Sequence, residues 1–371
     1  MLLLLALISG EKEKFNISFQ FTPSSSHSET GSSEKTELVV NSVEASSIDS
    51  AVNLMNAYMA KELSLSHCRL IIFSEEVAYD GISDEIYTLT NDAQIRPSTN
   101  IIVSKNDAKN YLKNSQSPLE NLITKNYEIF PNSSKYTGYV YDATLGDFIN
   151  QLVSTTGEPI AILGGLNNNS KDSFDNSTQV NNIKSTNTSF VGENQTENLG
   201  VAVFNDDKLV GELSALDTLC LSIIHKKVNS FLIQAPDADN PIEDIDVMLY
   251  PKRKISIDVK IVNGSPYITV KTHFIGRIYS MKENSKYLDD TVLKNLSNQV
   301  SKYLEKILTD YLYKTSLEFK ADINDFGRYS AKNFLTVNEF EQYNWKQNYE
   351  NSIFNVDSDV VIKSGFLVTE T

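Results

Sequence analysis

The stretch KISIDVKIVNGSPYITVKTHFIGRIYSM, residues 254–281, constrains the fold more than any other part of the chain. Hydrophobic residues alternate with polar ones on both sides of Asn263-Gly264, the dipeptide favoured in two-residue hairpin turns. The pattern predicts an antiparallel hairpin with one apolar face, formed by Ile255, Ile257, Val259 and Ile261 on the first strand and by Ile268, Val270, Phe274 and Ile278 on the second.

A long amphipathic helix and a last strand follow this hairpin. Residues 287–316 place one apolar stripe at helical spacing, made of Val292, Leu296, Val300, Leu304, Ile307 and Tyr311. Residues 354–368 alternate again and predict a strand. The C-terminal part therefore predicts an α+β domain, with an antiparallel sheet packed on one long helix.

The N-terminal part alternates between strands and helices. Two strands joined by a charged turn are expected within residues 1–21, and continuous apolar runs at residues 70–73 and 160–163 indicate buried strands. The segment after residue 47 predicts a helix with an apolar face of Leu54, Met55, Tyr58, Met59 and Leu63. Such alternation favours a mixed α/β domain with partly parallel pairing.

At 371 residues, the chain is too long for one ordinary domain. We predict an α+β fold class with three mixed α/β domains: an N-terminal α/β domain at 1–127, a small middle α+β domain at 128–227 and a C-terminal α+β domain at 228–371. Residues 166–198 are biased toward Asn, Ser and Thr, so a long disordered loop is expected there.

Charge and cysteine content exclude several classes of function. The formal net charge of −15 argues against a nucleic-acid partner, because phosphate binding requires clustered Lys and Arg. The two cysteines, Cys68 and Cys220, lie in apolar runs, where buried free thiols are the commoner outcome and a disulfide is the alternative. No CxxC pair indicates a zinc or redox site.

No motif indicates catalysis or a cofactor. The histidines His27, His67, His225 and His273 are scattered without metal-ligand spacing. The acidic stretch at 237–246 lacks the glycine and the bidentate glutamate of an EF-hand loop. Nucleotide-binding glycine loops, GxSxG and HExxH are absent from the sequence. We therefore predict no catalytic residue, no metal and no cofactor.

The lone tryptophan lies in the aromatic stretch FEQYNWKQNYE, residues 340–350. Tyr343, Trp345 and Tyr349 are candidates for a partner interface, because Trp and Tyr are favoured anchors. The other interpretation is packing against the C-terminal strand.

Four blocks resemble the GerAC, or Ger(x)C, family, the C subunits of the nutrient germinant receptors of spore-forming bacteria. LSLSHCRLIIFSEEVAYDGI (63–82) and RPSTNIIVSKNDAKNYL (96–112) resemble its first two blocks. LGVAVFNDDKLVGELSALDTLC (199–220) resembles the family's G-x-A-V-F-x-x-D-K-L-V-G-x-L block. ADINDFGRY (321–329), with Trp345 downstream, resembles its D-x-x-x-F-G…W region. The blocks occur in order over nearly the whole chain.

The resemblance implies a non-enzymatic receptor subunit that supports assembly and signalling in germination. It implies integral-membrane A and B subunits as partners, and a location on the outer face of the inner spore membrane through a lipidated N-terminal cysteine. No L-x-G-C lipobox lies near this N-terminus, and Cys68 and Cys220 lie too far into the folded region to serve. Either the chain is cytosolic or an export signal lies upstream, and the family pattern favours a truncated start.

Two other functions stay open from the sequence. The alternative is a surface-anchored nutrient-binding protein that captures its ligand in a cleft between domains. The third is an enzyme of unknown type, which would need a pocket with convergent His, Glu or Asp side chains of perturbed pKa.

Overall fold

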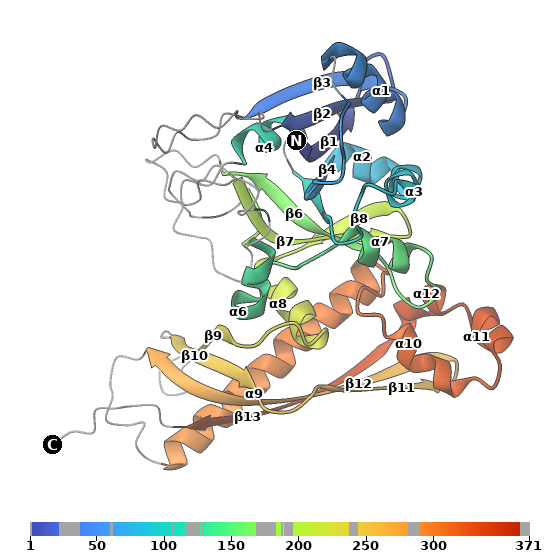
Figure 1. Cartoon of the computed structure of the whole chain (residues 1–371). Helices are drawn as coiled ribbons and strands as arrows, with labels where there is room; N and C mark the ends of the chain where they lie inside the picture. Colours follow the sequence, from blue (N-terminus) through green and yellow to red (C-terminus); the bar gives the residue numbers. More distant parts are fainter. Residues whose placement is uncertain are drawn as a thin grey trace. The chain divides into compact units, whose positions relative to one another are not determined.

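The computed structural model describes residues 2–21, 38–59, 62–105, 107–115, 127, 130–167, 183–186, 188, 196–236, 244–280 and 290–363. The chain divides into two compact units. Unit 1 comprises Met1–Ser133, Tyr139–Ser154 and Glu158–Thr218, and unit 2 comprises Ser134–Gly138, Thr155–Gly157 and Leu219–Thr371. Each unit is built on its own β-sheet (Figure 1).

Unit 1 contains an eight-stranded mixed sheet. Its strands are β1 (Leu2–Ser9), β2 (Phe15–Phe21), β3 (Val39–Ala45), β4 (Leu70–Ser74), β5 (Asn100–Ser104), β6 (Ile160–Leu166), β7 (Thr196–Asn205) and β8 (Lys208–Leu213). The order across the sheet is β3-β2-β1-β4-β5-β6-β7-β8. The four central strands, β1, β4, β5 and β6, run parallel, and an antiparallel pair extends the sheet at each side. The expected partly parallel pairing is therefore present.

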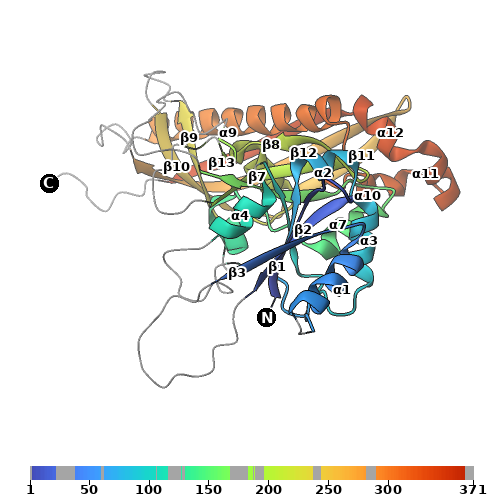
Figure 2. The same ribbon diagram turned by 90° about the horizontal axis from the view of Figure 1, so that it is seen from above.

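Helices cover both faces of this sheet. They are α1 (Ile48–Met59), α2 (Glu75–Asp80), α3 (Ser83–Asn91), α4 (Ala108–Asn114) and α7 (Leu145–Leu152), with a 3-10 turn η1 (Phe130–Ser133). Figures 1 and 2 show α4 on the opposite side of the sheet from α1 and α3. Every residue of β4 and β5 is buried, as expected for central strands that are covered on both faces.

Alternate strand residues divide between the two faces. Leu7, Phe73, Val103 and Leu163 belong to one core cluster with α1, α2, α3 and α7. On the other face, Gly164 lies against Ile102 and the ring of Tyr111 in α4.

The predicted apolar face of α1 is partly wrong, because Met55, Met59 and Leu63 belong to or pack on the core, while Leu54 and Tyr58 do not. The helix buries Ile48, Ala51 and Met55, while Leu54 and Tyr58 are 47% and 78% exposed. Because Ile48, Ala51 and Met55 are spaced three and four residues apart, they form a stripe about one residue out of phase with the predicted one.

One sheet joins strands from both sides of the expected boundary at residue 127. β5 pairs with β6 through Ile102↔Ile162 and Val103↔Leu163. The three-domain division at 1–127, 128–227 and 228–371 stays a prediction about which pieces fold independently.

Most of the loop expected at 166–198 lies outside the described residues, but its described part includes the fully buried Ser185, and β7 already begins at Thr196.

Unit 2 contains a five-stranded sheet covered by one long helix. Its strands are β9 (Phe231–Pro236), β10 (Asp244–Pro251), β11 (Ser256–Val262), β12 (Ser265–Ser280) and β13 (Ile353–Lys363). The helices are α6 (Ser134–Thr137), α8 (Ala215–Ile224), which begins in unit 1, α9 (Asp290–Tyr313), α10 (Gly327–Ser330), α11 (Val337–Tyr343) and α12 (Trp345–Asn348), with shorter turns η4 (Lys314–Glu318), η5 (Ala331–Asn333) and η6 (Tyr349–Asn351).

The predicted hairpin is confirmed as β11 and β12. Asn263 and Gly264 form its turn with φ angles of 51° and 86°, the left-handed values that a type I′ turn requires. The α+β fold class, with a sheet on one long helix, is confirmed as well. Within that sheet β13 pairs parallel to β12, through Tyr267↔Ile353 to Arg277↔Lys363, rather than antiparallel.

Helix α9 covers the free edge of β13 (Figure 2). The amides of Ser358, Val360 and Ile362 donate to Glu305, Ser301 and Ser297, at 3.1, 3.0 and 3.0 Å. The spacing fits because four helical residues rise about 6 Å and two strand residues about 6.6 Å. Helix α9 therefore satisfies an edge that would otherwise be open to pairing with another chain.

The buried face of α9 matches the prediction closely. Leu296, Val300, Leu304, Ile307 and Tyr311 are buried, and Leu293 replaces Val292 at the start of the stripe. Within the part of the chain that the structure covers, no helix has the length and apolar character needed to cross a bilayer.

Candidate functional site

The described cysteines form no disulfide, and the described acidic residues form no metal cluster. Cys68 and Cys220 are both buried free thiols, as the sequence favoured. Burial raises the pKa of Cys68 to about 12, so this thiol stays protonated at neutral pH. Among the described residues, no group of three or more His, Cys, Asp or Glu side chains is placed to hold a metal ion. The acidic stretch at 237–246 lies mainly outside the described residues.

The three predicted interface aromatics lie near one another but are not an exposed patch. Trp345 and Tyr349 are 1% and 0% exposed, so the expected exposure of these two side chains is wrong. Tyr343 is half-buried, and its hydroxyl donates to the carbonyl of Gly264 at 2.8 Å. The ring of Tyr349 meets Phe354 of β13 edge-on at 6.2 Å between ring centroids, so this side chain packs against the C-terminal strand.

A buried aspartate holds the indole of Trp345 in the interior. Asp322 is 1% exposed, and its carboxylate accepts hydrogen bonds from the Trp345 indole Nε1 at 2.8 Å and the Gly327 amide at 2.9 Å. The Asn324 amide donates to the other oxygen at 3.2 Å. Burial raises the pKa of Asp322 to about 7, although these N–H donors act in the opposite direction.

Gly327 is needed in this motif because the Thr156 carbonyl and the Trp345 ring lie close to its Cα atom. A Cβ atom at residue 327 would lie 2.5 Å from the carbonyl oxygen of Thr156 and 2.6 Å from the Trp345 ring. The D-x-x-x-F-G…W residues therefore form one packing and hydrogen-bonding unit, which we call the Asp322 cluster: Asp322, Gly327, Trp345 and Tyr349. The sequence contained its members but gave no sign that they contact one another.

The block at 199–220 is also structural, and it contacts the block at 63–82. The turn between β7 and β8 places Asp207 against the loop that joins α2 to α3. The Asp207 carbonyl accepts from the Ile82 amide at 3.1 Å, and its carboxylate accepts from the Ser83 amide at 3.4 Å. Gly81 has a φ of +113°, and a Cβ atom there would lie 2.7 Å from the Asp207 carboxylate. Hydrogen bonds and close packing thus hold the turn of the 199–220 block against the end of the 63–82 block.

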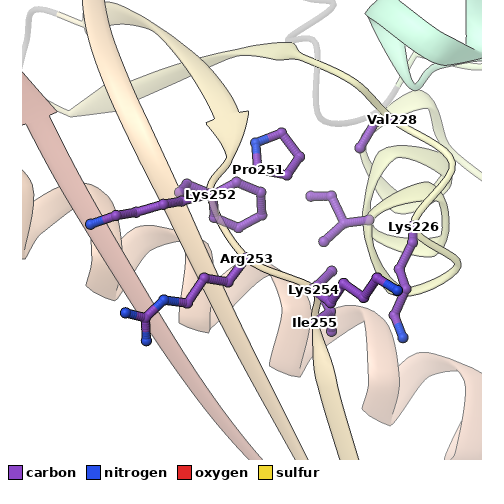
Figure 3. Close-up of a pocket in the computed structure, with 9 residues that line it drawn as sticks. Lys226, Val228, Pro251, Lys252, Arg253, Lys254 and Ile255 are labelled. Carbon is purple, nitrogen blue, oxygen red and sulfur yellow. The ribbon is translucent and has the colours of Figure 1, made fainter.

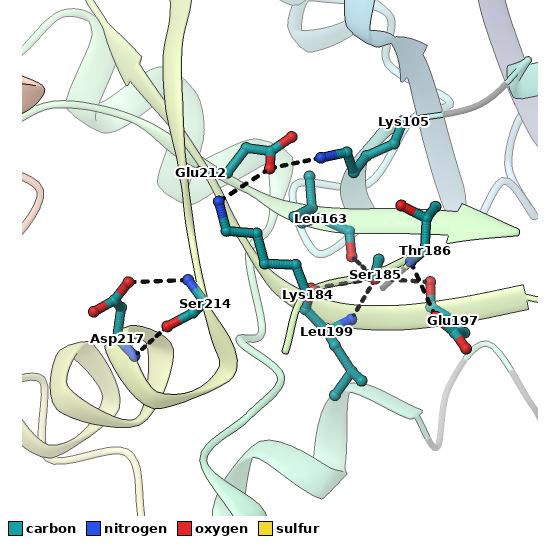
Figure 4. Close-up of polar contacts among 10 residues, drawn as sticks. All are labelled: Lys105, Leu163, Lys184, Ser185, Thr186, Glu197, Leu199, Glu212, Ser214 and Asp217. Carbon is teal, nitrogen blue, oxygen red and sulfur yellow. Dashed lines mark hydrogen bonds and ion pairs between the residues drawn. The ribbon is translucent and has the colours of Figure 1, made fainter. Parts of the chain in front are cut away.

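The end of the same block contains a helix cap and two ion pairs (Figure 4). Ser214 and Asp217 exchange hydrogen bonds of 3.1 Å, a capping box that starts α8. Glu212 accepts from Lys105 at 2.7 Å and from Lys184 at 3.3 Å.

Ser185, beside these ion pairs, bridges two strands. Its hydroxyl lies 2.9 Å from the Leu163 carbonyl in β6 and accepts from the Leu199 amide in β7 at 2.7 Å (Figure 4). The network thus ties the described part of the predicted loop to the sheet.

Among the described residues, a basic pocket in unit 2 is a candidate binding site (Figure 3). It lies between the end of α8 and the loop from β10 to β11, with a volume of about 490 Å³. Its described lining is an apolar floor and a cationic rim, namely Ile223, Val228, Pro251, Ile255 and Phe274, with Lys226, Lys252, Arg253 and Lys254. No sequence pattern predicts this pocket, because three separate segments of the chain contribute to it.

The fold is shared with a solved structure. The crystal structure of the GerBC protein superposes with a TM-score of 0.55 and 15% identity, over 96% of this chain and 96% of that one.

Sequence comparison defines the family. Residues 1–164 match the family model for the spore germination protein N-terminal domain, and residues 199–365 match the one for the spore germination B3/GerAC-like C-terminal domain. The chain therefore belongs to the GerAC-like family of spore germination proteins.

Two curated relatives come from Bacillus subtilis (strain 168). Spore germination protein KC is 23% identical over 338 residues, which cover 86% of this chain and 76% of the relative. Putative spore germination protein YfkR is 22% identical over 350 residues, covering 90% of this chain and 80% of the relative.

Proposed function

We propose that this chain is the non-enzymatic C subunit of a nutrient germinant receptor, supporting assembly and signalling in spore germination. The observation that carries the proposal is the match of both family models, which together extend from residue 1 to residue 365. The name of the relative spore germination protein KC supports the same process.

The described polar groups favour a structural role over a catalytic one. The carboxylate of Asp322, whose pKa is the clearest candidate for a catalytic value near neutrality, is enclosed by Trp345 and Gly327. Catalysis needs such a group to reach a substrate, and Asp322 is 1% exposed.

The partners in this proposal are the integral-membrane A and B subunits of the receptor. The location is the outer face of the inner spore membrane, with a lipidated cysteine as anchor that is neither Cys68 nor Cys220, since both of these are buried. Because one acyl chain gives only marginal membrane binding, contacts with the A and B subunits would supply much of the attachment.

Co-purification from spore membranes tests the assembly. A tagged copy of the chain, expressed with the A and B subunits of its host, should retain both after detergent extraction. A tagged copy with Asp322→Ala, which we expect to be destabilised, is the matched control and should retain less of both subunits. Recovery of the wild-type chain without either subunit would contradict the proposal.

A further inference from the structure

We propose that the basic pocket of unit 2 binds an organic anion, with an apolar body on the pocket floor and a carboxylate or phosphate group at the lysine rim. The proposal concerns a site that family membership does not assign, and the purified chain is enough to test it.

The charge of the rim is the first argument. Four of the nine described lining residues are cationic, in a chain whose formal net charge is −15. None of these four side chains forms an ion pair with a residue that the structure describes, whereas Lys14, Lys105, Lys184 and Lys332 each do. Like charges repel, so unpaired cations around one hollow favour an anion there.

The arrangement of the cations is the second argument. Lys252, Arg253 and Lys254 are consecutive and exposed, in a loop whose Lys252 amide donates to the His273 carbonyl of β12 at 2.8 Å. Lys226 follows α8 in a left-handed conformation with a φ of 60°. In Figure 3 the side chains of Lys226 and Lys254 extend to one side of the pocket, and those of Lys252 and Arg253 extend to the other. Lys226 and Lys254 are therefore the first candidates for contact with the anionic group.

The apolar floor of the pocket determines which chemistry the uncharged part of the ligand must have. Ile223, Val228, Ile255 and Phe274 are buried core residues, so the hollow ends on an apolar surface. A volume of about 490 Å³ lies in the range of small-molecule sites, which are mostly apolar with a few fixed polar groups. An inorganic anion would leave this floor uncovered, so the matching ligand combines an apolar body with its charge.

Two sources present this chemistry, a free organic acid or phosphate ester and the headgroup region of an acidic phospholipid. The free source is tested by calorimetric titration of the purified chain with phenyl phosphate and benzoate. Inorganic phosphate (charge only) and benzyl alcohol (ring only) are the comparison ligands. The lipid source is tested by co-sedimentation with phosphatidylglycerol–phosphatidylcholine vesicles against pure phosphatidylcholine vesicles.

We expect saturable binding of an aromatic anion, or preference for the acidic vesicles, with weaker binding of both comparison ligands. The variant Lys226→Glu with Lys254→Glu should weaken binding about tenfold or more, since each removes a charge-assisted contact. Raising the salt from about 0.05 M to about 0.5 M should weaken it too. The variant Lys208→Glu with Lys294→Glu changes the net charge equally at exposed positions outside the pocket and should bind normally.

Binding of the soluble anions identifies a free ligand, and binding to acidic vesicles alone identifies a lipid headgroup. A second variant, Lys252→Glu with Arg253→Glu in the exposed loop, replaces the first if the latter fails to fold. No saturable binding in either arm, or equal loss in the pocket and control variants, would overturn the proposal. Neither result bears on co-purification with the A and B subunits, so the two proposals fail separately.

Discussion

The Asp322 cluster and the basic pocket, both in unit 2, use charge in opposite ways. In the cluster, one carboxylate is enclosed and receives N–H donors from Trp345, Gly327 and Asn324. In the pocket, four exposed cations surround an apolar floor without a described ion-pair partner. The cluster carries a family-like sequence motif and the pocket carries none. Motif residues of this chain hold the fold together, while the candidate binding pocket among the described residues has no sequence signature.

The largest expected effect comes from removing the central carboxylate. Asp322→Ala leaves several buried N–H donors without an acceptor, so it should lower the free energy of unfolding by about 3 kcal/mol or more. Denaturant unfolding of the purified chain measures the change. Asp359→Ala, at an exposed carboxylate 3.2 Å from His273, is the control and should change stability by less than about 0.5 kcal/mol. Equal effects of the two substitutions would mean that the cluster is not structural.

A smaller loss is expected from Gly327→Ala. The added methyl group would clash with the Thr156 carbonyl and the Trp345 ring, and such overpacking costs about 1–3 kcal/mol. The loss should appear in the same unfolding assay, together with a change in tryptophan fluorescence, because Trp345 is the only tryptophan of the chain. Asn338→Ala, at an exposed position of α11, is the control. Unchanged stability and fluorescence in Gly327→Ala would contradict the close packing.

The local features of unit 2 could be predicted from the sequence, whereas its long-range contacts could not. The turn at Asn263-Gly264 and the stripe of α9 were predictable because neighbouring residues determine them. The parallel pairing of β13 with β12 was not, because it depends on residues about 86 positions apart, such as Thr272 and Ser358. The hydrogen bond that holds the buried Trp345 indole was not predictable for the same reason, since its acceptor Asp322 lies 23 residues earlier.

The pH dependence of stability tests the raised pKa of Asp322. Its ordinary value is 3.8 and its folded value about 7, so between these pH values the folded chain keeps a proton that the unfolded chain has released. The stabilisation is complete below pH 3.8 and is lost as the pH rises toward about 7. The difference in free energy of unfolding between wild type and Asp322→Asn should therefore shrink over this interval. A difference that grows with pH would mean that the N–H donors outweigh burial.

The smallest effect on stability is expected at the pocket. Because the rim side chains are exposed, Lys226→Glu with Lys254→Glu should change the free energy of unfolding by less than about 1 kcal/mol. Thermal unfolding measures this change, with the Lys208→Glu, Lys294→Glu variant as the control in the same assay. A loss comparable with that of Asp322→Ala would show that the rim is part of the folding core, and the contrast between the two regions would then fail.

The most direct test of the whole account is nutrient-triggered release of dipicolinic acid from spores of the host. The strain lacks its other nutrient receptors and carries the A and B subunits, with or without this chain. The account predicts release only when the chain is present, with chemically triggered germination equal in both strains. Equal nutrient-triggered release without the chain would contradict its role as a receptor subunit.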